Sequence, residues 1–192
     1  MRYSDEKLHH RLTGKAVHYL GRYASTTARL EVVLKRFAER KLSDAEPGQV
    51  SKAIDHVIKD CVSKGYVNDQ LYAEQKTTSL RRQGRSRRMI EKTLAARGLD
   101  RSVIGAALMV DAEADDMAHE WAAALIHARR RRLGPFASER DKQGDLDKIR
   151  QRHLASFARA GFNLALAGKI LALKSPEDAE EMLAEMQPFL NG

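Results

Sequence analysis

Apolar residues recur along most of the chain at the spacing of one helix face. Steps of three and four residues separate them at 30–37, 50–61, 103–108 and 117–128. This spacing is typical of amphipathic α-helices. The alternation of Val, Ile and Thr with polar residues that marks strands is absent. The pattern therefore predicts an all-α fold.

Residues that favour helix ends stand between these runs. Ser25 is the expected N-cap of the helix that carries Leu30, and Ser86 or Arg85 is expected to open the helix that carries Ile90. Gly98 and Gly161 stand where a left-handed residue would end a helix. These signals predict several helices of moderate length.

The hydrophobic pattern also repeats itself at an interval of about 60 residues. Each copy of the pattern contains the same pair of positions, four residues apart. The pairs are Leu30 and Leu34, Ile90 and Leu94, and His153 and Phe157. Gly98 and Gly161 then follow the second and third pairs by four residues. The repetition predicts three tandem copies of one three-helix, helix-turn-helix-like unit.

We expect four segments along the chain. They are an N-terminal helix with repeat 1 (1–66), repeat 2 (67–111), repeat 3 (112–174) and an acidic C-terminal helix (175–192). Polar loops at 40–48 and 134–144 would absorb the differences in repeat length. A three-helix unit of this size buries little surface alone, so neighbouring repeats should pack together into an elongated, curved body.

The chain is basic, with a formal net charge of +8. A basic excess favours a polyanionic partner, because Lys and Arg neutralise phosphates and release counterions. Cys61 is the single cysteine and falls in an apolar stripe, which favours a small buried side chain in a reducing compartment. Neither a signal-peptide core nor an 18-residue apolar run is present, so we expect a cytoplasmic protein without a membrane span.

Residue spacings typical of catalysis are missing from the sequence. It has no HExxH, CxxC, GxSxG or GxxxxGK[ST] motif. The seven histidines never stand at metal-ligand spacing from Cys or Glu. We therefore expect a protein that is not an enzyme, with no catalytic residues, no metal site and no cofactor.

Charge is strongly segregated. Residues 81–101 hold eight Lys or Arg against two acids, and 129–132 is an unbroken arginine run, whereas 111–120 and 175–192 are acidic. The two basic clusters occupy comparable places in repeats 2 and 3. Arginine suits phosphate through its bidentate fork, although arginine near a helix C-terminus can also simply solvate that end. The candidate DNA- or filament-binding residues are Arg81, Arg82, Arg85, Arg87, Arg88, Arg129, Arg130, Arg131 and Arg132.

Aromatic residues do not interleave with these arginines. The aromatic residues that fall in apolar stripes are expected in the core: Tyr19, Tyr23, Phe37, Trp121, Phe157 and Phe162. Recognition of bases by stacking is therefore poorly supported. Electrostatic contact with a nucleic-acid backbone, or with a protein–nucleic-acid assembly, fits the pattern better.

Three stretches together resemble the RecX family. They are YLGRYAS at 19–25 followed by Leu30 and Leu34, GYVNDQLYA at 65–73, and the ordered set Gly84, Ile90, Leu94 and Gly98. The resemblance covers about residues 13–173. The chain departs from the family pattern at Arg29, where an acid is common, and at His153, where an apolar residue is expected.

The resemblance implies a regulator of the RecA recombinase, with inhibition as the expected sign. It implies binding to the RecA filament on single-stranded DNA, DNA binding of its own that extends to double-stranded DNA, and a monomer that acts in DNA repair, recombination and the SOS response. The family has no catalytic residues, so the resemblance assigns none to this sequence. From the residues alone, a helix-turn-helix transcriptional regulator that reads duplex DNA with the helix at 86–97 is the alternative, and a pure protein scaffold is a third possibility.

Overall fold

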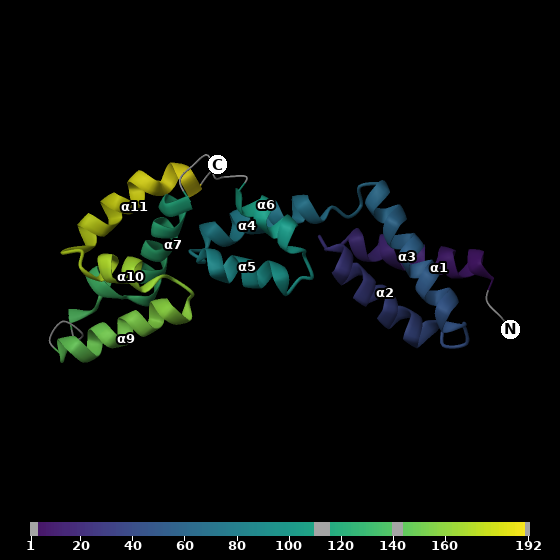
Figure 1. Ribbon diagram of the computed structural model, residues 1–192, viewed down its shortest axis with the longest axis horizontal. Helices are drawn as coiled ribbons and strands as arrows, with labels where there is room; N and C mark the ends of the chain where they lie inside the picture. The colour runs from purple at the N-terminus through teal and green to yellow at the C-terminus, as the bar shows by residue number, and fades with distance from the viewer. Residues whose placement is uncertain (1–3, 110–115, 140–143, 191–192) are drawn as a thin grey trace. The chain divides into compact units, whose positions relative to one another are not determined.

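The computed structural model describes residues 4–109, 116–139 and 144–190. Within these ranges the chain forms ten α-helices and one short 3-10 helix, and it has no strand (Figure 1). The prediction of an all-α fold is confirmed. The chain divides into two compact units, which we call unit 1 (1–73 and 95–103) and unit 2 (74–94 and 104–192).

The helices follow the predicted order of three per repeat. They are α1 (Asp5–Leu20), α2 (Thr27–Lys41), α3 (Pro47–Ser63), α4 (Asp69–Arg82), α5 (Arg87–Ala95), α6 (Arg101–Met109), α7 (Asp116–Arg131), the 3-10 helix η1 (Gly134–Phe136), α9 (Leu146–Arg159), α10 (Leu164–Leu171) and α11 (Pro176–Leu190). The predicted boundary at 111–112, and part of the acidic segment 111–120, lie outside the described residues. The segment boundaries and the elongated arrangement stay predictions. None of the described helices has the length and apolar character that a membrane span requires.

The core of unit 1 lies between α1, α2 and α3. Fully buried leucines from α1 and α2 meet an apolar stripe of α3 that contains Ile54 and Val57. Cys61 belongs to the same stripe and is 3% exposed, which confirms the expected buried position. Burial is also the main reason why the pKa of its thiol is raised, so the thiol stays protonated and packs as a small apolar group. The expected core position of Tyr23 was wrong, because that residue is 58% exposed.

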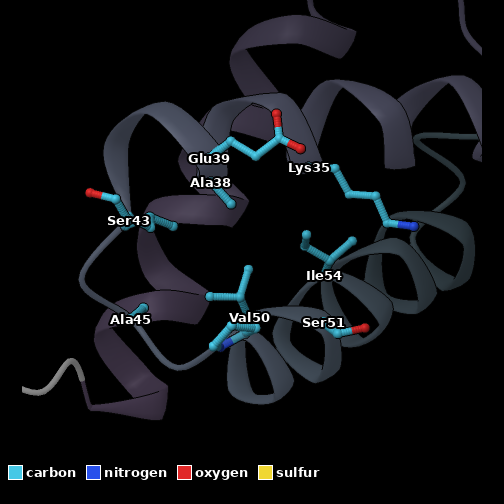
Figure 2. A pocket seen from close by; sticks show the side chains of 10 residues that line it. Lys35, Ala38, Glu39, Ser43, Ala45, Val50, Ser51 and Ile54 are labelled. Atoms are coloured by element: carbon cyan, nitrogen blue, oxygen red, sulfur yellow. The ribbon is translucent and has the colours of Figure 1, made fainter.

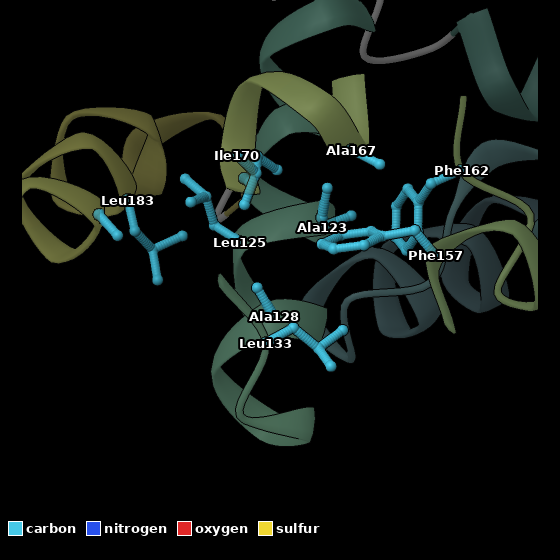
Figure 3. Close-up of a cluster of buried hydrophobic side chains, with 12 residues drawn as sticks. Ala123, Leu125, Ala128, Leu133, Phe157, Phe162, Ala167, Ile170 and Leu183 are labelled. Carbon is cyan, nitrogen blue, oxygen red and sulfur yellow. The ribbon is translucent and has the colours of Figure 1, made fainter. Parts of the chain in front are cut away.

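The core of unit 2 is built around α7 (Figure 3). Alanines and Leu125 line the buried face of α7, and small side chains let helices pack closely. The rings of Phe157 from α9 and Phe162 lie edge to face with centroids 5.8 Å apart. Leu183 of the acidic helix α11 is 3% exposed in this same core, so α11 packs as a structural part of unit 2.

The repeated positions found in the sequence are all core positions. Each is at most 4% exposed: Leu30, Leu34, Ile90, Leu94, His153 and Phe157. The polar residue among them, His153, accepts a hydrogen bond at Nδ1 from the backbone N–H of Gly134 at 3.2 Å. This bond satisfies a buried polar atom that would otherwise destabilise the core, and it explains how repeat 3 tolerates a histidine there.

The two predicted helix starts have different outcomes. The cap of α2 is Thr26, whose Oγ1 accepts from the Arg29 N–H at 3.1 Å, so the prediction of Ser25 was wrong by one residue. Ser86 caps α5 as expected, because its Oγ accepts from the Met89 N–H.

Within unit 1, the N-terminus of α2 meets the turn after α5. The hydroxyl of Thr26 donates to the Arg97 carbonyl at 2.7 Å, and the Thr27 N–H donates to the Asp69 carboxylate at 2.8 Å. Gly98 has φ +78°, and a Cβ there would collide with Ala28. The long-range bond to Arg97 explains why Thr26, rather than Ser25, is the cap.

Within unit 2, the same contact is built from equivalent residues. The hydroxyl of Ser86 donates to the Ala160 carbonyl at 2.6 Å, and the Arg87 N–H donates to the Glu120 carboxylate at 2.9 Å. Gly161 has φ +85°, and a Cβ there would lie 2.7 Å from the Ser86 Oγ. The predicted left-handed conformations of both glycines are confirmed, and each glycine also leaves room for the helix start that packs on it.

Candidate nucleic-acid interface

The turn between α4 and α5 lies against the C-terminal half of α7. Gly84, in this turn, has φ +70°, and a Cβ there would clash with Ile126 of α7. The Arg130 guanidinium donates from Nη1 to the Gln83 carbonyl at 2.9 Å. Because the turn carries one arginine cluster and the end of α7 carries the other, the fold of unit 2 brings the two clusters together.

Four exposed arginines surround this junction, and we call them the arginine surface: Arg85, Arg88, Arg130 and Arg131. Arg85, Arg130 and Arg131 all act electrostatically on one side chain, His127. The Cβ of Arg88 lies beside Gly161, the residue before Phe162, and the ring of Phe162 is 5.4 Å from the ring of His127. Residues from α5, α7 and one turn thus present four positive charges in the same region of unit 2.

His127 forms the partly buried floor of this region. Its Nε2 lies 3.3 Å from the Ser156 Oγ, and its ring is 5.3 Å from that of Phe157. Burial, followed by the charges of Arg131, Arg130 and Arg85, lowers the pKa of His127 to about 4. The imidazole is therefore neutral near pH 7. Our sequence analysis missed His127, although its place three and four residues before Arg130 and Arg131 was a usable signal.

We expect the low pKa of His127 to make unit 2 less stable in mild acid. The unfolded chain binds a proton near pH 6.5 and the folded chain only near pH 4, so stability is lost as the pH falls through this range. Between pH 7 and pH 5 the loss due to His127 should be about 1–2 kcal/mol. Urea unfolding followed by Trp121 fluorescence should show a weaker pH dependence in His127→Asn. Equal pH dependence in both proteins would contradict the assignment.

Arg81 does not share the exposed position of the other candidates. Its side chain is 5% exposed, and its Nη2 donates to the Leu108 carbonyl at 3.1 Å. The guanidinium thus joins α4 to α6 from within, and a role for Arg81 in facing a ligand does not fit this burial. Arg82 is exposed at the C-terminus of α4, and Arg132, which adopts φ +54°, is exposed in the turn directly after α7.

Two further candidate arginines form ion pairs with acids of unit 2. Arg87 Nε lies 3.2 Å from Glu91 Oε1 on α5, and Arg129 Nη1 lies 3.0 Å from Glu180 Oε2 on α11. All four side chains are between one third and one half exposed, so each pair stabilises the fold only slightly. The pairs nevertheless offset part of the positive charge, which makes Arg87 and Arg129 weaker candidates than the arginine surface.

Unit 1 has a separate apolar pocket between α2 and α3 (Figure 2). Its volume is about 330 Å³, and its walls include Leu42, Val50 and Ile54, with Lys35 and Glu39 at its edge. Its lining holds no arginine, histidine or cysteine. Its charged groups are therefore one lysine and one glutamate, without the cluster of arginines or the set of histidines and cysteines that would indicate a polyanion or zinc site.

Known proteins similar to this chain share one family. The family model of the RecX second three-helix domain matches residues 68–108. A regulatory protein RecX of Myxococcus xanthus is 38% identical over 162 residues, which cover 83% of each chain. A regulatory protein RecX of Agrobacterium fabrum is 29% identical over 170 residues, which cover 88% of this chain and 86% of the relative. No solved structure matches the chain. With this extent of similarity, the chain belongs to the RecX family.

Proposed function

We propose that this chain is a non-enzymatic regulator that binds the RecA filament on single-stranded DNA and inhibits its activity. It acts as a cytoplasmic monomer and also binds free DNA, single-stranded or double-stranded. Membership of a family of regulatory proteins supports the general role. The observation that carries the proposal is the arginine surface, because two clusters far apart in the sequence meet in unit 2.

The chemistry of the arginine surface fits phosphate groups. Each guanidinium presents several donors in a planar fork and remains charged at every physiological pH. The neutral imidazole of His127 adds no charge, so the field at this surface is set by the arginines. The aromatic rings of Phe157 and Phe162 are buried and cannot stack on bases. We therefore expect recognition of the DNA backbone or of an acidic filament surface, with little dependence on base sequence.

The transcriptional-regulator alternative is not favoured by the surroundings of α5. A helix-turn-helix reader places the N-terminal residues of its recognition helix against base edges. Here the N-terminus of α5 is engaged within unit 2 by the bonds of Ser86 and Arg87 to Ala160 and Glu120. A discrete palindromic footprint on duplex DNA would support the alternative over our proposal.

A titration of the chain into RecA on single-stranded DNA tests the proposal. We expect the DNA-dependent ATP hydrolysis of RecA to fall as the chain approaches equimolar amounts, and the inhibition to weaken as salt is raised. The chain with RecA but without DNA is the control, since it reports any effect that does not need the filament. Unchanged hydrolysis at equimolar chain would contradict the proposed function.

A further inference from the structure

Two histidines and an aspartate converge on the surface of unit 1. His9 on α1 places its Nε2 3.2 Å from Asp60 Oδ2, and His56 on α3 places its Nε2 3.9 Å from Asp60 Oδ1. The two imidazole rings lie nearly perpendicular with centroids 5.3 Å apart. One donor atom from each of the three side chains lies within 4.8 Å of the other two. We propose that His9, His56 and Asp60 form a binding site for a divalent transition metal of the zinc class.

The separation of the donor atoms agrees with this kind of ion. Zinc binds histidine nitrogen and carboxylate oxygen at about 2.0–2.2 Å, so neighbouring ligands of a tetrahedral site lie about 3.3–3.5 Å apart. The distance from His9 Nε2 to Asp60 Oδ2 is 3.2 Å, close to this value, and the distance from His56 Nε2 to the other carboxylate oxygen, Oδ1, is 3.9 Å. The three donor atoms lie within 4.8 Å of one another, so the side chains would have to move closer together to bind one ion.

The secondary structure holds the three ligands in place. His56 and Asp60 are four residues apart on α3 and therefore share one face of that helix. His9 follows the fully buried Leu8, which fixes α1 against α3 in the core of unit 1. The site thus rests on two packed helices, and packed helices position ligands more precisely than loops do.

The ligand types and their exposure narrow the class of ion. Two imidazoles and one carboxylate suit zinc, cobalt or nickel, whereas magnesium and calcium prefer oxygen ligands alone. The side chains of His9, His56 and Asp60 are 37%, 70% and 35% exposed. A fourth position is consequently open to water or to an external ligand, and the ion would tie α1 to α3 at the surface. This proposal does not depend on the arginine surface, which lies in unit 2.

Cobalt titration of the metal-free full-length chain tests the site. We expect one Co²⁺ per chain with the visible d–d absorption of a low-coordinate site, displaced by Zn²⁺. His9→Asn and His56→Asn should each weaken binding by at least about tenfold, since each removes one of three ligands. At the same concentration, Zn²⁺ should raise the thermal midpoint of the wild-type chain more than that of His56→Asn, because ligand binding to the folded state stabilises it and weaker binding stabilises it less.

Control variants distinguish Co²⁺ binding at this site from binding by other histidines of α1 or by the Cys61 thiol. His10→Asn and His18→Asn change exposed histidines of the same helix α1 and should bind Co²⁺ like the wild type. His56 is largely exposed, so circular dichroism should show unchanged helicity in His56→Asn. The proposal is overturned if the wild type binds no Co²⁺ at equimolar amounts, if His10→Asn is as deficient as His9→Asn, or if a thiolate-to-cobalt band identifies Cys61 as the ligand.

Discussion

Replacing Phe157 with alanine should lower the free energy of unfolding of unit 2 by about 3–5 kcal/mol. The ring is fully buried, lies edge to face with Phe162 and packs 5.3 Å from the ring of His127. Alanine would remove this apolar surface from the core and leave a cavity between α7 and α9, which close-packed neighbours fill only in part. Trp121, the single tryptophan, packs against the same core, so its fluorescence in urea reports unit 2 specifically.

A matched control for Phe157→Ala is Leu164→Ala on α10. Leu164 is 58% exposed in the same unit, so its truncation should change the stability by less than about 0.5 kcal/mol. A loss below about 1 kcal/mol for Phe157→Ala would contradict the core that we describe.

Reversing the charge of three residues of the arginine surface should weaken binding to single-stranded DNA by about 10- to 100-fold at physiological salt. The variant carries Arg85→Glu, Arg88→Glu and Arg131→Glu, and it keeps Arg130, which holds the Gln83 carbonyl. Each phosphate contact on a single strand contributes about 0.7 to the slope of log affinity against log salt, so the slope should become less steep by about 2. Fluorescence anisotropy of a labelled oligonucleotide at several salt concentrations measures both quantities.

The control for this variant carries the same change of charge in unit 1. Arg36→Glu, Lys52→Glu and Lys59→Glu alter exposed residues of α2 and α3. Each reversal changes the formal charge by two, so three of them take the net charge from +8 to +2 in either variant. We expect the control to lose less than about threefold in affinity. Equal losses in the two variants would show that net charge alone drives binding.

Much of the fold could be predicted because buried positions recur with a regular spacing. Leu34, Leu94 and Phe157 are all fully buried, and the spacing that relates them is visible in the sequence. Glycines with positive φ were equally visible, since Gly98 and Gly161 occupy the same place in successive repeats. Hydrophobic spacing and glycine positions predict these elements correctly because the same helix–turn–helix structure occurs in more than one repeat.

Contacts between distant helices could not be predicted from one sequence. Arg81 stands in a basic run like its neighbours, and only its bond to a carbonyl 27 residues further along explains its burial. Ser25 and Thr26 are equally good caps by sequence, and the Arg97 carbonyl distinguishes them. His9 and Asp60 are 51 residues apart, so no spacing rule for metal ligands brings them together.

The most direct test of our central claim compares three proteins in the RecA ATPase titration on single-stranded DNA. They are the wild type, the variant with Arg85→Glu, Arg88→Glu and Arg131→Glu, and the unit 1 control with Arg36→Glu, Lys52→Glu and Lys59→Glu. We predict that the wild type and the unit 1 control inhibit hydrolysis alike, whereas the reversal variant needs at least about tenfold more protein for the same effect. Inhibition by the reversal variant at wild-type concentrations would contradict the claim that the arginine surface carries the regulatory function.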